Sequence, residues 1–505
     1  MTRKSKNKRG KKAAHIDSSK STAAGDLARW KIVSFSILVP VLFFAILEGL
    51  LTIAGVEVTR YESDPYVGFS STAPLFQEAR LADGSAVLRT VPNKFTLFNA
   101  MQFPRDKSAG TFRIFCTGGS TTYGRPYTNN TSFCGWLRQF LAALDSTRRW
   151  EVINAGGISY ASYRVALLTE ELIDYEPDLF IVYSGHNEFL EKRTYGELIA
   201  MPRSIHGLTA WLRSTRIYSV LERMLDGFRS PPDGDTSTDD GLLAAEVRPL
   251  LDSSIGPDAY TRDDDLRDQV LRHYRFNLAR TIDIASSVGA ASILVTPASN
   301  LRNTTPFKSE HRSGLDMAEQ KQQQELIQSA TLALDADNPV EALPLLDQAL
   351  SIDDRYAHAW FLKGRALEQL GQFEEARTAY EKARDEDIVP LRALSSMDDI
   401  VKEVAGDRDV PLIDFVQLVD QRSPNQLPGE SLFLDHVHPT IEANRLLALA
   451  LVDQMRRMGI VRIAVTSPAD VIEQVTRQVL TGLNRRSHAE AMNNLSKVQA
   501  WAGQL

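Results

Sequence analysis

The sequence predicts an α/β fold built on a five-stranded parallel sheet. Short apolar segments with the residue types or alternation of strands recur at residues 111–116, 150–154, 178–184, 291–296 and 411–415. Segments with apolar residues at helical spacing follow several of them, at residues 132–144, 163–175 and 263–290. Strands that alternate with helices in this way are typical of βαβ units, whose strands pair in parallel.

Length and composition narrow the classes of function. The chain has 505 residues, enough for several domains, and its 43% hydrophobic and 24% charged residues are ordinary for a globular protein. The net charge is −7 although residues 1–29 are strongly basic, so the rest of the chain is acidic and no nucleic-acid partner is expected. The histidines lack the spacing of metal ligands, so neither a metal nor another cofactor is expected.

The N-terminal part has the pattern of a membrane anchor. Residues 1–31 form a basic tail, and residues 32–56 form a mostly apolar run whose single charge is Glu48. Such a run is long enough to span a bilayer as a helix. The basic flank before it predicts a cytoplasmic N-terminus and a periplasmic or extracellular body. A cleaved signal peptide is the alternative, but no good cleavage site follows the run.

A candidate nucleophile follows the first strand. The strand ends at Gly118 and Gly119, which can turn sharply, and Ser120 stands at the exit. A serine lifted on a tight turn at the carboxyl end of a strand is a common position for a reactive group in open α/β sheets. Alone, this signal is weak, because most such turns are ordinary.

Three later segments strengthen the signal. A second strand at 150–154 ends in a glycine-rich turn, a third at 178–184 ends in Gly-His-Asn-Glu with Asn187, and residues 434–440 read LDHVHPT with Asp435 and His438. This ordered set resembles the SGNH (GDSL-like) hydrolases, a superfamily of serine esterases, lipases and polysaccharide acetyl-esterases. The resemblance covers residues 111 to about 459, with interruptions.

The resemblance implies a three-layer, flavodoxin-like α/β/α fold and a catalytic set. Ser120 is the expected nucleophile, His438 the base and Asp435 the carboxylate that orients the base. Asp435 precedes His438 by three residues, which places both on one side if the segment is helical. The expected oxyanion hole consists of the backbone N–H groups of Ser120 and Ser159 and the side-chain amide of Asn187.

The sequence departs from the family pattern at two positions, and three details stay open. Gly119 replaces the usual aspartate, and Ser159 stands where the second block has a glycine. His436 is a competing base, which we expect to point away from Asp435. Glu188 either braces its loop or faces the substrate. Cys116 and Cys134 form either a disulfide or two buried thiols, and neither looks catalytic.

The sequence divides into seven segments. After the tail and the apolar run come a β-rich lead-in at 57–110, the first part of the hydrolase domain at 111–315, a helical insertion at 316–404, the last part of the hydrolase domain at 405–459 and a helical extension at 460–505. Within the insertion, two windows of 34 residues carry the small and large positions of tetratricopeptide repeats, at residues 323–356 and 357–390. Protein recognition and structural support are both open as its role. Residues 189–260 interrupt the α/β pattern and either shape the substrate cleft or decorate the surface.

The leading hypothesis is a membrane-anchored, extracytoplasmic serine hydrolase that cleaves acetyl-type esters, with a polysaccharide or lipid among the candidate substrates. An O-acyltransferase acting on envelope polysaccharide is the second hypothesis, and the loss of the usual aspartate at Gly119 favours it slightly. A tethered interaction protein with an inactive hydrolase fold is the third, with its helical repeats binding a protein partner.

Overall fold

The computed structural model describes residues 38, 42–44, 46–52, 74–190, 216, 260–483 and 489. The chain divides into two compact units, and the larger consists of residues 65–69, 73–201 and 238–505. The basic tail, most of the predicted span and residues 191–259, apart from residue 216, lie outside the described residues. Among the residues described, none of the helices combines the length and apolar character that a bilayer crossing requires.

The larger unit contains the predicted five-stranded parallel sheet. Its strands lie in the order β5-β4-β6-β7-β8 and all neighbours pair in parallel. Counted from the first strand of the sheet, this is the 2-1-3-4-5 order of flavodoxin-like folds. The strands are β4 (Thr111–Gly118), β5 (Arg149–Gly156), β6 (Leu179–Tyr183), β7 (Ala291–Val295) and β8 (Leu412–Ile413).

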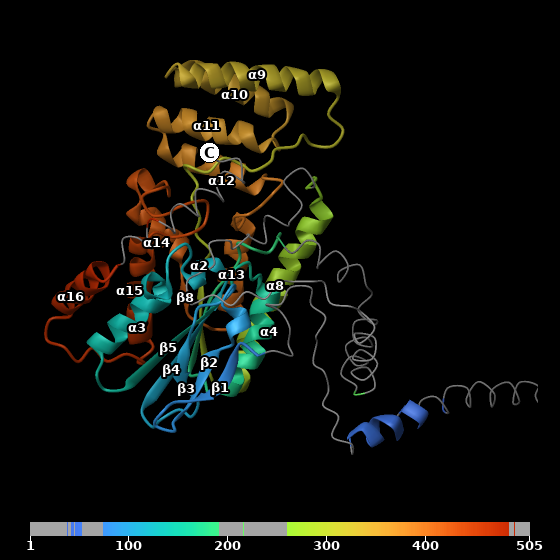
Figure 1. The fold of residues 1–505 in the computed structure, drawn as a ribbon. Coiled ribbons are helices and arrows are strands. Elements are labelled where there is room, and N and C mark those ends of the chain that lie inside the picture. Colours follow the sequence, from blue (N-terminus) through green and yellow to red (C-terminus); the bar gives the residue numbers. More distant parts are fainter. Residues whose placement is uncertain are drawn as a thin grey trace, which may run out of the picture. The chain divides into compact units, whose positions relative to one another are not determined.

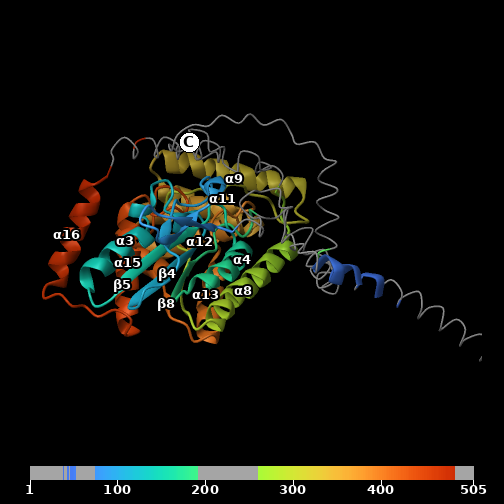
Figure 2. The ribbon, with the colours of Figure 1, turned by 60° about the horizontal axis from the view of Figure 1, so that its bottom comes forward.

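Helices cover both faces of the sheet and complete the predicted three layers (Figures 1 and 2). Alternate strand residues enter separate cores: Ile114 and Ile181 pack in one, and Phe115 and Phe180 in the other. The first core is closed by α3 (Phe133–Leu144), α14 (Phe415–Arg422), α15 (Ile441–Arg457) and α16 (Pro468–Thr481). The second is closed by α4 (Ser162–Leu172), α8 (Asp264–Ser287) and α13 (Ser395–Asp407).

The described part of the lead-in, from residue 74, is a small antiparallel sheet. Its strands are β1 (Phe76–Arg80), β2 (Ala86–Thr90) and β3 (Gln102–Pro104). The rings of Phe76 and Phe103 pack into the second core of the main sheet. The buried Arg113 of β4 donates to the carbonyl of Pro104 at 2.8 Å and to Glu151 at 2.7 Å. The β-rich lead-in that the sequence predicts therefore packs on the α/β core.

The helical insertion consists of two antiparallel helix pairs (Figure 1). The first pair is α9 (Met317–Asp335) with α10 (Pro339–Ile352), and the second is α11 (Ala357–Gln369) with α12 (Phe373–Asp385). Small buried side chains such as Ala330, Ala349 and Ala366 let the helices approach closely. The four predicted helices are therefore present. Helix α13, which the sequence boundary at 404 places mostly in the insertion, packs instead against the sheet.

The insertion leans on the α/β layer, as two repeats that bury little surface alone are expected to do. Tyr380 and Phe361 share a hydrophobic cluster with Leu301 and Leu427 of the α/β domain. Arg377 of α12 pairs with Asp420 of α14, and Arg355 with Asp264 of α8. These contacts bring the insertion against the loop after β7, helix α14 and the start of α8.

Gly364 provides a test of the helix packing in the insertion. A Cβ atom at this position would lie 2.6 Å from ring carbons of Tyr380, which is 1% exposed. We expect Gly364→Ala to lower the free energy of unfolding by roughly 1–3 kcal/mol, because the ring must shift in a packed core. Gly406→Ala is the matched control: Gly406 lies in α13 with open space around it, so alanine should be neutral or stabilising there. Equal melting temperatures for the two variants would contradict this packing.

Candidate active site

Ser120 lies where the sequence predicts, on a strand–turn–helix at the carboxyl end of β4. The strand ends at Gly118, Gly119 is the N-cap residue, and Ser120 begins the short helix α2 (Ser120–Tyr123). Gly118 has φ 153° and packs against the backbone carbonyl of Tyr183, so no side chain fits there. A Cβ atom at Gly119 would overlap the side-chain amide nitrogen of Asn187. The turn therefore needs both glycines, the second because Asn187 occupies the space beside it.

His438 and Asp435 lie on a turn between the 3₁₀ turn at Pro424–Gln426 and α15. The turn is closed by a bridge between Phe433 and Pro439 and by a bond of 2.9 Å from the N–H of Leu434 to the carbonyl of His438. The segment is not helical, so the condition under which the sequence places Asp435 and His438 on one side is not met. The pair faces one way because Asp435 Oδ1 accepts the backbone N–H of His438 at 2.7 Å.

The structure brings Ser120, His438 and Asp435 into one hydrogen-bonded chain. His438 Nε2 lies 2.8 Å from Ser120 Oγ, and His438 Nδ1 lies 2.6 Å from Asp435 Oδ2. With Nδ1–H donated to the carboxylate, Nε2 is left to accept the serine proton. The side chain of Asp435 is only 2% exposed and that of His438 12%. A substrate can therefore reach the serine while the carboxylate stays screened from water.

The charge of Asp435 is stabilised locally. Burial opposes ionisation, but the charges of His438 and His436 and the hydrogen bonds from His438 outweigh it and hold the pKa of Asp435 well below its usual range. Asp435 is thus ionised throughout the neutral range and can stabilise an imidazolium at His438.

Two groups near Ser120 can donate hydrogen bonds to an oxyanion. The backbone N–H of Ser120 is at the start of α2, where a helix leaves it unpaired. Asn187 Nδ2 lies beside Gly119 and donates to the carbonyl of Tyr160 at 3.0 Å. Tyr160 follows Ser159, whose φ of 61° lies in the left-handed region. The backbone of Ser159 therefore has a conformation that glycine adopts most readily, and its N–H stays the third donor that the sequence predicts.

His436 does not lie where the sequence suggests. Its Nδ1 is 3.8 Å from Asp435 Oδ1, and its ring packs against Phe307 at 5.2 Å between centroids. The expectation that it points away from Asp435 is therefore wrong, because the carboxylate and the Phe307 ring together hold it in the interior. Burial lowers the pKa of His436 to about 4, and Asp435 only partly opposes this, so the ring is neutral at pH 7.

Glu188 braces the loop, which settles one of the open details. Its side chain is buried and accepts the backbone N–H of Ser162 at 2.8 Å and the hydroxyl of Ser162 at 2.7 Å. Ser162 begins α4, so Glu188 connects the loop after β6 to the start of that helix. It thereby fixes the backbone next to Asn187.

His186 and Arg125 are site residues that sequence reasoning missed. His186 is buried and its Nδ1 accepts the backbone N–H of Ala393 at 3.2 Å, which leaves the proton on Nε2. Arg125 follows the nucleophile by five residues, and among the described residues no carboxylate forms an ion pair with it. Burial lowers the pKa of Arg125, while the charges of Tyr123 and Asp435 raise it. The guanidinium therefore interacts electrostatically with the carboxylate of the site. The signal in the sequence that could have identified Arg125 is a basic residue five positions after the candidate nucleophile.

His186 leads to a pH prediction. Burial, with the neighbouring His436 and His438, lowers its pKa to about 3, against about 6.5 in an unfolded chain. The unfolded state therefore binds the extra proton between these values, so this residue contributes stability above pH 6.5 that is lost as the pH falls. We expect His186→Gln, whose side-chain oxygen can still accept the N–H of Ala393, to reduce the loss of unfolding free energy between pH 7 and pH 5 by roughly 2 kcal/mol. Urea titrations at both pH values measure this, and an unchanged pH slope would contradict it.

The two cysteines form a disulfide between β4 and α3, with 6.4 Å between the Cα atoms of Cys116 and Cys134. This decides between the two alternatives that the sequence left open. Within residues 74–190 and 260–483, no group of three or more His, Cys, Asp or Glu side chains could hold a metal ion.

Residues 327–389 match the family model described as tetratricopeptide repeat, and no curated protein matches the chain. An acetylxylan esterase from Geobacillus stearothermophilus has a similar structure at 12% identity and a TM-score of 0.32, covering 71% of this chain and 99% of its own. A GDSL-like lipase from Bacteroides thetaiotaomicron gives 10%, 0.28, 70% and 93% for the same quantities. A lipase/acylhydrolase from Enterococcus faecalis gives 12%, 0.31, 70% and 100%. At identities and TM-scores this low, the assignment of function rests on the geometry of the site.

Proposed function

We propose that this protein is a serine ester hydrolase that forms an acyl-enzyme on Ser120. The observation that carries the proposal is the hydrogen-bonded chain from Ser120 Oγ through His438 to Asp435, with distances of 2.8 and 2.6 Å. A serine hydroxyl is a weak nucleophile at neutral pH, and a base within hydrogen-bond reach that is itself oriented by a carboxylate activates it.

The geometry supports the following sequence of steps. Ser120 Oγ attacks the ester carbonyl and its proton passes to His438 Nε2, while Asp435 stabilises the imidazolium. The oxyanion accepts hydrogen bonds from the Ser120 and Ser159 N–H groups and from Asn187. Collapse of the intermediate releases the alcohol, which takes the proton from His438. Water then attacks the acyl-enzyme and gives a proton to His438. The second intermediate collapses to release the carboxylic acid, and Ser120 Oγ takes the proton back from His438.

Replacement of Ser120 tests the proposal. We expect Ser120→Ala to reduce hydrolysis of p-nitrophenyl acetate to the background rate, because no other described hydroxyl contacts His438 Nε2. Ser159→Ala is a matched control, since its proposed role uses the backbone N–H and alanine keeps that group. Initial rates for the two variants and the wild type give the answer. Undiminished activity of Ser120→Ala would remove Ser120 from the mechanism.

Acetyl-type esters of a polysaccharide remain the proposed substrates. Arg125 supports substrates that are rich in oxygen acceptors. Its half-buried guanidinium forms no ion pair with a carboxylate of the described residues, so acceptors on a substrate would satisfy its N–H groups.

We also propose an extracytoplasmic location with a single N-terminal membrane anchor. Its support is the apolar run at residues 32–56, the basic flank before it and the acidic residues after it. The Cys116–Cys134 disulfide adds to this support, because disulfides persist mainly in oxidising compartments.

For the helical insertion we propose a supporting role, with recognition of a protein partner as a further role that its repeat family suggests. The supporting role rests on the ion pair from Arg377 to Asp420 and on the hydrophobic cluster that Tyr380 shares with Leu301 and Leu427. Both contacts hold the loops that precede the Asp435–His438 turn.

A further inference from the structure

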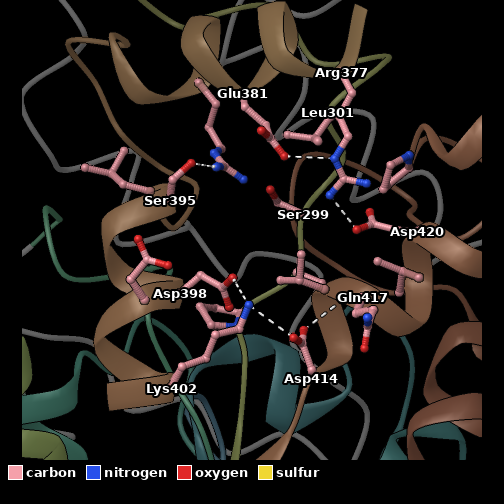
Figure 3. Close-up of a pocket in the computed structure, with 18 residues that line it drawn as sticks. Ser299, Leu301, Arg377, Glu381, Ser395, Asp398, Lys402, Asp414, Gln417 and Asp420 are labelled. Atoms are coloured by element: carbon pink, nitrogen blue, oxygen red, sulfur yellow. Dashed lines mark hydrogen bonds and ion pairs between the residues drawn. The ribbon is translucent and has the colours of Figure 1, made fainter. Parts of the chain in front are cut away.

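Two segments beside the helical insertion are linked to the catalytic turn, the residues 433–439 that carry the base and its carboxylate. One is the loop at residues 296–315, between β7 and α9, and the other is the connecting segment at residues 386–394, between α12 and α13. Near its start the loop lies against the insertion, where Leu301 lines a cavity together with Arg377 of α12 (Figure 3). The contacts among these segments connect the insertion to the active site.

The loop holds the catalytic turn through two contacts with His436. The backbone N–H of Asn300 donates to the carbonyl of His436 at 3.0 Å. The ring of Phe307 packs edge to face on the ring of His436, with 5.2 Å between the centroids. On the other side of the turn, Asn444 of α15 donates to the carbonyl of Pro439 at 3.1 Å. The turn is therefore held from two sides, and the loop provides one of them.

The connecting segment in its turn holds the loop. Arg392 Nη1 donates to the carbonyl of Asn300 at 2.9 Å and to that of Thr304 at 3.2 Å. Asp387 Oδ2 accepts the backbone N–H of Phe307 at 2.8 Å. The side chains of Arg392 and Asp387 are each 2% exposed. Each of the two loop residues that contact the catalytic turn is thus fixed by a buried charged group.

Arg392 is costly to bury. Its Nε and Nη2 have no hydrogen-bond partner among the described residues, and its ion pair with Asp387 is long, at 4.0 Å from Nη2 to Oδ2. Burial lowers the pKa of Arg392 to about 10, although Asp387 opposes this, so the guanidinium is charged at neutral pH. Buried charges with unsatisfied donors cost free energy, and they are weak evidence for a stabilising role. The position of Arg392 therefore favours a role beyond stability.

We propose that Arg392 is a positioning residue, which holds the catalytic turn where His438 Nε2 reaches Ser120 Oγ. It acts through two successive hydrogen bonds, from its guanidinium to the carbonyl of Asn300 and from the N–H of Asn300 to the carbonyl of His436. This inference rests on the proposed acyl-enzyme mechanism. It makes the end of the helical insertion a part of the active site, because a small displacement of the base from the nucleophile costs a large factor in rate.

Arg392→Met in the full-length chain tests the proposal, because methionine removes every N–H donor of the side chain and leaves an apolar one. We expect kcat for p-nitrophenyl acetate to fall about tenfold to a hundredfold with KM nearly unchanged, since the alignment of base and nucleophile is lost. Labelling of Ser120 by a fluorophosphonate probe should slow by a similar factor. Arg392→Lys, which returns a charged donor, should recover part of both rates.

Arg138→Met is the matched control. The half-buried Arg138 of α3 also donates to a backbone carbonyl, that of Val152 at 2.7 Å, but it has no contact with the loop or the catalytic turn. Its kcat and labelling rate should equal those of the wild type. Phe307→Leu keeps the test decisive if Arg392→Met does not fold, because it removes the ring contact with His436 and retains the N–H that Asp387 accepts. It should also lower kcat more than it changes KM.

Circular dichroism verifies the folding of each variant before its rates are compared. The proposal is overturned if folded Arg392→Met, or Phe307→Leu in its place, turns over substrate and labels at the rate of the wild type. It is also overturned if Arg138→Met loses as much activity, or if Arg392→Lys recovers none. Failure of the proposed function itself is distinguishable, because the wild type would then not label at Ser120.

Discussion

Replacing His438 by alanine should lower kcat/KM for p-nitrophenyl acetate by about 10⁴-fold or more, because Ser120 then has no base within reach. Asp435→Asn should cost about as much, since an amide cannot hold His438 in the tautomer that leaves Nε2 free to accept the serine proton. Steady-state kinetics on the purified variants, with circular dichroism to verify folding, measure both effects.

His436→Ala is the control for this prediction. His436 is buried beside Asp435, 3.8 Å away, but it is His438 that contacts the serine at 2.8 Å. The loss of activity in His436→Ala should therefore be far smaller than in His438→Ala. A larger loss in His436→Ala than in His438→Ala would show that His436, and not His438, is the base.

Gly119→Ala should reduce kcat by about a hundredfold to a thousandfold, the usual loss for one oxyanion donor. The added Cβ atom overlaps the side-chain amide nitrogen of Asn187, so the amide must move away from the nucleophile. The physical reason for glycine at this position is thus the space that Asn187 needs. KM should change less than kcat, because the lost interaction belongs to the transition state.

A double-mutant cycle checks this explanation. Asn187→Ala should cost about as much as Gly119→Ala, and the double variant should be no worse than either, since both remove the same donor. Additive losses in the double variant would show that Gly119 acts on something other than Asn187.

The sequence was sufficient to predict the sheet and the residues that converge on it. Strand periodicity located β4 to β7 closely, and the carboxyl ends of β4 and β6 carry Ser120 and Asn187 as expected. Local patterns succeeded here because each strand is buried on both faces and its apolar run is bounded by turn residues.

The details that failed depend on contacts between distant residues. The spacing of Asp435 and His438 fits a helix and a turn equally well, and the bond from Leu434 to His438 selects the turn. The position of His436 depends on Phe307, and that of His186 on the N–H of Ala393, 207 residues away. The bracing role of Glu188 depends on Ser162, 26 residues away in the sequence. No local pattern in the sequence carries such information.

Covalent labelling tests the central claim most directly. A fluorophosphonate probe reacts with a serine that a neighbouring base has activated, and peptide mapping by mass spectrometry identifies the labelled residue. The geometry of the site predicts stoichiometric labelling at Ser120, none in Ser120→Ala and strongly slowed labelling in His438→Ala. A wild-type protein that stays unlabelled, or labels elsewhere, would contradict it.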